Sequence, residues 1–295
     1  MGKKLLLILN PRSGKMVGKR HLADVLEKFC REGYIPTVFV TTGCGNAREL
    51  AATHGGEADL VVCLGGDGTF NEVVSGLLTG GHSTPIGYIP CGSTNDFANS
   101  IGLKKTVPAA ADTILAGEPH TYDVGLFGER HFTYIASFGA FTRASYATPQ
   151  NVKNTLGHLA YVLEGIKDLS KIRPHHVRFE LEDGEVIEDD FIFGAISNST
   201  SVGGILTLDP KTVDMNDGLF ELLLVKMPKS VPELNDCIRM LTEQVYTPPV
   251  ITFRSASRLT VTAAPDMEWS LDGEWGSGSA QIAVQNLHDA IRLVK

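Results

Sequence analysis

A glycine-rich turn between a buried strand and a helix constrains this chain more than any other feature. Leu60–Leu64 is continuously apolar, as expected of a strand covered on both faces. Gly65-Gly66-Asp67-Gly68-Thr69 follows it, and Thr69–Leu78 has the pattern of a helix. Glycines let a ligand approach the backbone closely, and a helix N-terminus attracts anions. The pattern predicts a phosphate-binding loop, although a plain turn with Asp67 as a helix cap is the alternative.

Two more loops stand in the same position relative to a strand. Asn10–Lys15 follows the apolar strand Leu5–Leu9. Pro90–Ala98 follows the strand Ile86–Ile89 and opens a helix. Its polar residues at 93–96 are also good helix caps, which is the structural alternative. Because ligands bind at the carboxyl edge of parallel sheets, the three loops together favour a binding site.

The order of elements predicts two domains. Strands and helices alternate through the first 117 residues, which indicates a parallel sheet with helices on its faces. From about Thr121 the pattern becomes rich in strands, with hairpins at Gly128-Glu129 and Asp183-Gly184. We expect an α/β domain over residues 1–120, with 285–295 as a candidate segment to complete it. A mainly antiparallel β domain is expected over 121–284.

Charge and cysteine content exclude several classes of protein. The 295 residues carry 26 Lys+Arg and 34 Asp+Glu, a net charge of −8, which argues against a nucleic-acid partner. The five cysteines have no metal-site spacing, so reduced thiols in a cytoplasm are expected. Leu5–Leu9 is too short for the core of a signal peptide, and no run is long enough to span a membrane. A cytoplasmic protein that meets a membrane only transiently and at its surface fits these observations.

Two nucleotide-binding motifs can be set aside. Gly43–Arg48 follows a strand, but Arg48 occupies the third glycine position of a dinucleotide fingerprint. Asn10–Lys15 ends in Gly14-Lys15, yet Met16 replaces the hydroxyl residue of a P-loop. Neither a Rossmann dinucleotide site nor a P-loop fits the sequence.

Three motifs together resemble the diacylglycerol kinase catalytic family, and in particular its soluble bacterial lipid kinases. They are Asn10-Pro11-Arg12-Ser13-Gly14, Gly65–Glu72 and Pro90–Ala98. Gly-Gly-Asp-Gly-Thr alone also occurs in NAD kinases and 6-phosphofructokinases, whereas Gly92-Ser93-Thr94-Asn95-Asp96-Phe97-Ala98 is typical of the lipid kinases. The resemblance implies an α/β nucleotide domain like that of NAD and diacylglycerol kinases, a C-terminal β-sandwich, and ATP in a cleft between them.

The resemblance also assigns binding roles to matching positions. Asp67 would act through magnesium and its waters, with Asp96 and Asp123 supporting that network. Asp214, Asp217 and the backbone carbonyl of Leu219 would form a structural magnesium site. The residues expected to contact ATP are Asn10, Pro11, Arg12, Ser13, Gly14, Thr41, Gly66, Asp67, Gly68, Thr69, Phe70, Asn71, Glu72 and Thr94.

The chemistry of phosphoryl transfer agrees with these assignments. The reaction depends on positioning and on cations that neutralise charge, and Mg²⁺ takes few carboxylates and several waters. Leu271-Asp272-Gly273-Glu274 would place two acids on a turn, where one could accept a proton from a hydroxyl. The resemblance favours Glu274 as general base, while Asp272 and Asp67 stay candidates for the catalytic role.

The sequence therefore predicts an ATP- and Mg²⁺-dependent kinase that phosphorylates a lipid hydroxyl at the bilayer surface. Diacylglycerol, giving phosphatidic acid, is the first candidate acceptor. Phosphatidylglycerol, a sphingoid base, ceramide or a polyprenol are alternatives of the same chemistry. An NAD kinase and a catalytically inactive, nucleotide-responsive regulator are alternatives of other classes. A symmetric homodimer is the default assembly.

Overall fold

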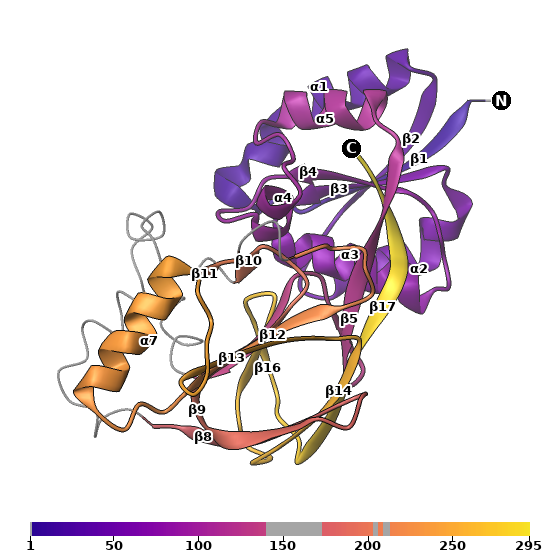
Figure 1. Cartoon of the computed structure of the whole chain (residues 1–295). Helices are drawn as coiled ribbons and strands as arrows, with labels where there is room; N and C mark the ends of the chain where they lie inside the picture. Colours follow the sequence, from indigo (N-terminus) through magenta and orange to yellow (C-terminus); the bar gives the residue numbers. More distant parts are fainter. Residues whose placement is uncertain (1, 140–172, 203–205, 209–212) are drawn as a thin grey trace. The chain divides into compact units, whose positions relative to one another are not determined.

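The computed structural model describes residues 2–139, 173–202, 206–208 and 213–295. These residues form two compact units (Figure 1). The first contains residues 1–123 and 289–295, and the second contains residues 124–288. Strands β5 (Pro119–Phe127) and β17 (Gln281–Val294) contribute residues to both units. Each unit has a hydrophobic core of its own.

The first unit alternates strands and helices. Its remaining elements are β1 (Lys3–Leu9), the 3-10 turn Gly14–Met16, α1 (Val17–Arg31), β2 (Tyr34–Val40), α2 (Asn46–His54), the 3-10 turn Gly55–Glu57, β3 (Leu60–Gly65), α3 (Asp67–Thr79), β4 (Ile86–Pro90), α4 (Asp96–Ser100) and α5 (Val107–Ala116).

A parallel sheet in the order β2-β1-β3-β4 forms the centre of this unit. All residues of β3 and β4 are buried, which explains why these strands are apolar on both faces. Helices α1 and α5 pack together against one face, and α2 and α3 pack together (Figure 1). The end of β17 adds a further parallel strand, since Leu293 pairs with Ile86 of β4.

The second unit is built mainly from antiparallel strands. Its elements are β6 (Arg130–Phe132), β7 (Ile135–Gly139), β8 (His175–Leu181), β9 (Val186–Ser197), β10 (Ser201–Val202), β11 (Leu206–Thr207), β12 (Phe220–Lys226), α7 (Val231–Glu243), β13 (Ile251–Ala256), β14 (Arg258–Ala263), β15 (Trp269–Leu271) and β16 (Glu274–Gly276).

Its longest path of paired strands runs β16-β15-β7-β9-β8-β14-β17, and β12 joins β9 to β13. Side chains from these strands meet in an aromatic core in which Phe138 and Phe127 both contact Trp269. The predicted fold class, an α/β unit followed by an antiparallel β-sandwich, is confirmed.

One predicted strand is wrong. The sequence suggested a single strand over His131–Ser137, but the structure has β6, a break at Thr133-Tyr134, and β7. The break occurs because the backbone N–H groups at the break bond to a carboxylate from a distant turn, as described below. A helix was also expected from the apolar spacing of Leu156, Leu159, Leu163, Ile166 and Leu169, and it lies outside the described residues.

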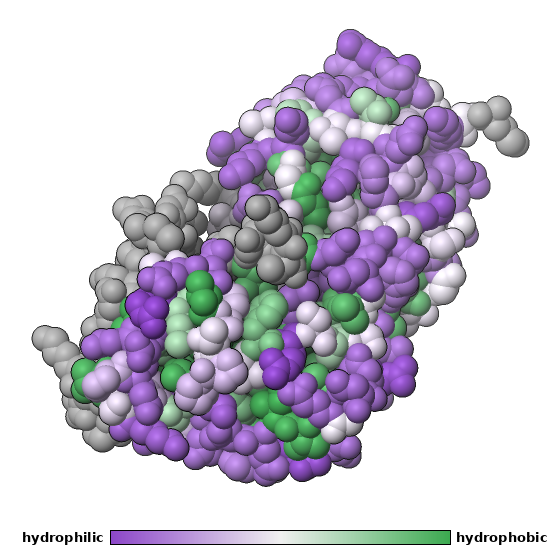
Figure 2. Space-filling view, viewed as in Figure 1, coloured by the Kyte–Doolittle hydropathy of each residue, from purple (hydrophilic) through white to green (hydrophobic). Residues whose placement is uncertain are grey.

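Much of the visible molecular surface is hydrophilic, with hydrophobic residues in small groups (Figure 2). No helix in the described part of the chain is long and apolar enough to cross a membrane.

Candidate active site

Three loops of the first unit meet at the carboxyl edge of its parallel sheet. The backbone N–H of Asn10, just after β1, donates to the carbonyl of Leu64 in β3 at 3.0 Å. The N–H of Cys91, just after β4, donates to the carbonyl of Gly65 at 2.6 Å. Asn10 Nδ2 also donates to Thr69 Oγ1 at 2.9 Å. The loops that sequence reasoning placed at one edge are therefore hydrogen-bonded to one another.

Glycines stand where the backbones of these loops approach most closely. A Cβ atom added to Gly92 would lie 2.8 Å from the Cα of Gly66, so the second and third loops leave no room for a side chain there. A Cβ atom added to Gly14 would lie 1.7 Å from the carbonyl oxygen of Cys91. This close packing holds the three loops together beside the N-terminus of α3, which begins after Gly66 and can offer N–H groups to phosphate oxygens.

Asp67 is the first residue of α3 and is held from the third loop. Its Oδ2 accepts a hydrogen bond from the backbone N–H of Asp96 at 3.1 Å and one from Thr94 Oγ1 at 3.4 Å. Asp67 and Asp96 are each only 8% exposed. The structure thus brings together three residues that the sequence linked to magnesium and ATP. Two buried carboxylates at one loop junction are suitable oxygen ligands for a hard cation such as Mg²⁺.

Two residues of the same motif have side chains engaged elsewhere. Phe70 is fully buried and stacks on both Tyr88 and Phe97 in the core. Glu72 accepts the N–H of Gly45 at 2.6 Å and of Ala47 at 3.0 Å, so it caps the start of α2. The two side chains anchor the loop to the core and to α2. Any contact of these residues with ATP would therefore come from their backbone.

The other predicted ATP contacts lie around the same edge. Thr41 donates its N–H to the carbonyl of Leu9 at 2.9 Å, which places the end of β2 beside the first loop. Arg12 is exposed, and its N–H donates to Asn10 Oδ1 at 3.0 Å. Pro11, Ser13, Gly68, Asn71 and Thr94 are half-buried.

Nearby titratable groups report an apolar environment beneath the loops. Burial raises the pKa of Cys91 to about 11. Burial also raises the pKa of Tyr88, and the negative charge of Asp67 raises it further. Both groups are uncharged near neutral pH, so the floor of the site contributes a low dielectric rather than charge.

Asp123 is buried at the point where the chain leaves the first unit. Its Oδ1 accepts the backbone N–H of Asp289 at 2.9 Å. Asp123 is the last residue of the N-terminal segment of the first unit, and Asp289 is the first residue of its C-terminal segment. The carboxylate therefore joins β5 to β17, a role that its place in the sequence did not suggest.

In the second unit, the two candidate bases lie at the turn between β15 and β16 and have different surroundings. Asp272 and Gly273 form the turn, both with positive φ, while Glu274 is the first residue of β16 and not part of the turn as expected. Glu274 is exposed. Asp272 is 6% exposed, and its carboxylate accepts hydrogen bonds from Thr133 N, Thr133 Oγ1, Tyr134 N and Ile135 N.

These contacts make Asp272 a structural residue. Burial raises the pKa of the Asp272 carboxyl, whereas the hydrogen bonds from four donors to its two oxygens oppose that rise. A general base must reach the proton that it removes. Glu274 satisfies that condition better because its side chain faces solvent.

The predicted magnesium loop lies elsewhere in the second unit. Asp214 Oδ1 accepts the N–H of Asn216 at 3.0 Å, and Asp217 Oδ1 accepts the N–H of Leu219 at 2.9 Å. The carbonyl of Leu219 accepts from Asn286 Nδ2 at 2.9 Å. These residues form a compact turn whose oxygens come from acids and from the backbone, as Mg²⁺ prefers.

Glu221, which sequence reasoning missed, supports that fit. It is 2% exposed, and its Oε2 has no hydrogen-bond partner. Burial, followed by the charge of Asp217, raises the pKa of Glu221 to about 8. One acid within the apolar run Phe220–Val225 was the available sequence signal. In the described part of the chain no group of three or more His, Cys, Asp or Glu forms a ready cage, so a cation here would need backbone oxygens and water.

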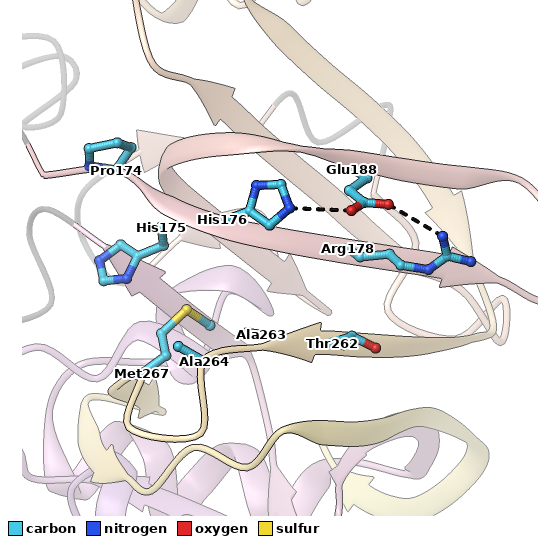
Figure 3. A pocket seen from close by; sticks show the side chains of 9 residues that line it. All are labelled: Pro174, His175, His176, Arg178, Glu188, Thr262, Ala263, Ala264 and Met267. Atoms are coloured by element: carbon cyan, nitrogen blue, oxygen red, sulfur yellow. Dashed lines mark hydrogen bonds and ion pairs between the residues drawn. The ribbon is translucent and has the colours of Figure 1, made fainter.

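A pocket of about 450 Å³ also lies in the second unit, beside β8 and β14 (Figure 3). Glu188 bonds to both His176 and Arg178, at 3.2 and 3.3 Å, and Met267 and Ala264 contribute apolar wall. Burial lowers the pKa of His175. None of the predicted site residues lines this pocket, and its charged groups already pair with each other.

Comparison with known proteins identifies the family of both units. Residues 4–127 match the diacylglycerol kinase catalytic domain, and residues 135–295 match the YegS C-terminal NAD kinase beta sandwich-like domain. A diacylglycerol kinase of Bacillus subtilis (strain 168) is 35% identical over 276 residues, 93% of this chain and 90% of its own length. A diacylglycerol kinase of Staphylococcus saprophyticus is 31% identical over 94% of this chain and 90% of its own.

A solved structure described as a diacylglycerol kinase from Bacillus anthracis str. Sterne has the same fold. It superposes with a TM-score of 0.76 and covers 99% of this chain and 97% of its own, at 19% identity. The chain is a kinase that transfers phosphate to a lipid hydroxyl, and it belongs to the diacylglycerol kinase catalytic family.

Proposed function

We propose that this kinase transfers the γ-phosphate of ATP to the free hydroxyl of diacylglycerol, with magnesium, and releases ADP and phosphatidic acid. The observation that carries the proposal is the junction of three loops at which Thr94 and Asp96 hold the buried carboxylate of Asp67. Phosphoryl transfer needs positioned phosphates and a nearby cation more than it needs covalent chemistry. The names of the relatives favour diacylglycerol as the acceptor.

The residues of the first unit bind the donor in this proposal. Backbone N–H groups around Gly66 and Gly92, together with the N-terminus of α3, receive the phosphates. Asp67, supported by Asp96, would hold Mg²⁺, which neutralises charge on the phosphate oxygens. Asn10 fixes the first loop through Thr69.

The second unit supplies the base. Glu274 removes the proton from the acceptor hydroxyl as its oxygen bonds to the γ-phosphorus and the bond to the ADP oxygen breaks. A lipid hydroxyl is a weak nucleophile near neutral pH, and a positioned base contributes about 10²–10⁴-fold. The loop Asp214–Leu219 would hold a second, structural Mg²⁺.

We place the enzyme at the cytoplasmic surface of a membrane, and we predict a homodimer.

Labelled phosphate transfer tests the proposal directly. The purified protein would be incubated with γ-labelled ATP and mixed micelles that each contain one lipid acceptor, with and without a magnesium chelator. We expect labelled phosphatidic acid from diacylglycerol, and its loss in Asp67→Asn and in the chelated sample.

Three results would overturn particular parts of the proposal. Preferential labelling of ceramide, a sphingoid base, phosphatidylglycerol or a polyprenol would replace the acceptor. Labelling of NAD, but of no lipid, would replace the enzyme class. Full activity in the chelated sample would remove magnesium from the mechanism.

A further inference from the structure

Trp275 presents a large aromatic side chain to solvent. It is 64% exposed, whereas the chain's other tryptophan, Trp269, is 2% exposed within the core. Among the described residues, no other Phe, Tyr or Trp is among the exposed large hydrophobic side chains. A tryptophan ring is on average largely buried, and one that is 64% exposed on an ordered strand is a candidate for contact with an apolar layer.

The backbone at Trp275 is firmly held. It lies on β16, where Trp275 pairs with Ser270 of β15. Arg130 Nη1 donates to its carbonyl at 3.0 Å. The preceding turn is fixed by the buried carboxylate of Asp272. The exposed indole therefore sits on an ordered hairpin and not on a loop that happens to extend into water.

The position of Trp275 in the chain identifies its partner. It follows Glu274, the proposed base, which must meet a hydroxyl near the glycerol level of a lipid layer. Consecutive side chains of β16 point to opposite faces, so the indole would enter that layer beside the hairpin and would not contact the reacting hydroxyl. An indole combines an apolar ring with one N–H donor and favours that boundary between hydrocarbon and water. The residues around it on the hairpin, Gly273, Glu274 and Ser277, are exposed and small or polar, so the apolar surface is too small for a protein interface.

We propose that the indole of Trp275 enters the headgroup and glycerol layer of a lipid surface and holds the β15–β16 hairpin there. This inference rests on the proposed function, because it takes the acceptor of Glu274 to be a lipid in that layer. Glu274 precedes Trp275, and Glu129 precedes Arg130, whose guanidinium donates to the Trp275 carbonyl. Two acids and one base in these positions give no net positive charge, so attraction to anionic lipid is not the driving force. The contact is hydrophobic and should persist at high salt.

The two tryptophans give a measurement that needs no turnover. Neutral phosphatidylcholine vesicles containing diacylglycerol would be added to the intact protein without ATP, and tryptophan emission would be recorded. We expect a blue shift, and quenching by phosphatidylcholine with brominated acyl chains. Trp275→Phe retains only the buried Trp269 and should show neither effect. The same emission change in Trp275→Phe would overturn the proposal, because the signal would then come from Trp269.

Vesicle affinity provides the second measurement. Partial burial of an aromatic ring is enough for about a tenfold change in affinity, so Trp275→Ala should bind the vesicles about tenfold more weakly. Trp275→Phe should recover most of that loss. Val231→Ala, at a residue 60% exposed on α7 in the same unit, is the matched control and should bind as the parent does. Equal binding by Trp275→Ala and the parent would overturn the proposal.

The outcomes separate this inference from the proposed function. If the parent phosphorylates diacylglycerol in vesicles but Trp275 shows no emission shift or quenching, the inference fails and the function stands. If Trp275 responds to the vesicles but no lipid is phosphorylated, the function fails and the lipid contact stands. A response in anionic vesicles alone, abolished by salt, would also overturn the inference, because it would assign docking to basic side chains.

Discussion

The carboxylate of Asp272 accepts both the backbone N–H of Thr133, at 2.6 Å, and its hydroxyl, at 2.8 Å, across 139 positions of sequence. The next two N–H groups, from Tyr134 and Ile135, donate to its other oxygen. One acid thereby breaks the strand between β6 and β7 and fixes the turn before Glu274. The contact joins local backbone geometry to the position of the proposed base.

Replacing Asp272 with alanine should destabilise the protein. Three buried backbone N–H groups and one hydroxyl would lose their acceptor, and each unsatisfied buried group costs about 1–3 kcal/mol. We therefore expect the free energy of unfolding in urea to fall by about 3 kcal/mol or more. Glu274→Ala, two residues away and exposed, should change it by less than about 0.5 kcal/mol. A stable but inactive Asp272→Ala would instead indicate a direct chemical role.

Glu274→Gln should lower kcat by at least about 10²-fold, because glutamine retains the size of the side chain but cannot accept the proton. ATP affinity and the melting temperature should stay close to those of the parent, since Glu274 is exposed. Steady-state kinetics with diacylglycerol micelles, equilibrium ATP binding and thermal melting measure the three quantities. If Glu274→Gln keeps most of its turnover while a folded Asp272→Asn does not, the wrong carboxylate has been chosen.

Gly92→Ala should weaken ATP binding. The added Cβ would lie 2.6 Å from Asn95 Oδ1 and 2.8 Å from the Cα of Gly66, so the two loops must separate. We expect at least a tenfold loss of ATP affinity by calorimetry, about 1.4 kcal/mol. Gly43→Ala is the control, since nothing lies within 4 Å of its added Cβ. Unchanged affinity in Gly92→Ala would show that the close approach of the loops is not needed for binding.

Glu221 should make stability fall as pH rises. Its pKa is about 8 in the folded protein against an ordinary value of 4.5, so between these values the folded state retains a proton that the unfolded state has lost. The folded state then binds more protons, and each pH unit in this window removes about 1.4 kcal/mol of this group's contribution. Below the window both states are protonated, and above it both are ionised, so the contribution is level on either side.

Glu221→Gln should remove this dependence. The difference in unfolding free energy between the variant and the parent should therefore move in favour of the variant from about pH 5 to pH 8. Urea titrations at several pH values measure it, with the exposed Glu57→Gln as control. A constant difference across this range would mean that Glu221 is ionised in the folded state at neutral pH.

Local patterns in the sequence predict the architecture of the first unit and the positions of its loops. Strands such as β3 are continuous apolar runs, and the glycine loop after it marks the start of α3, so neighbouring residues carry the signal. The family motifs are equally local. The second unit was recognisable as strand-rich for the same reason, because alternating segments and Asp-Gly turns are short-range patterns.

Contacts between residues far apart in the chain set the roles of several of these side chains. Sequence spacing could not show that Phe70 and Glu72 anchor the loop to the core and to α2. It also could not show that the carboxylate of Asp272 interrupts the strand between β6 and β7. Their partners are remote in the chain, as with Glu72 and Gly45 or Asp272 and Thr133. The contrast between the buried Glu221 and the exposed Trp275 is likewise set by which strands pair around them. Burial and hydrogen bonding depend on those distant neighbours, whereas strand and turn patterns depend on adjacent residues.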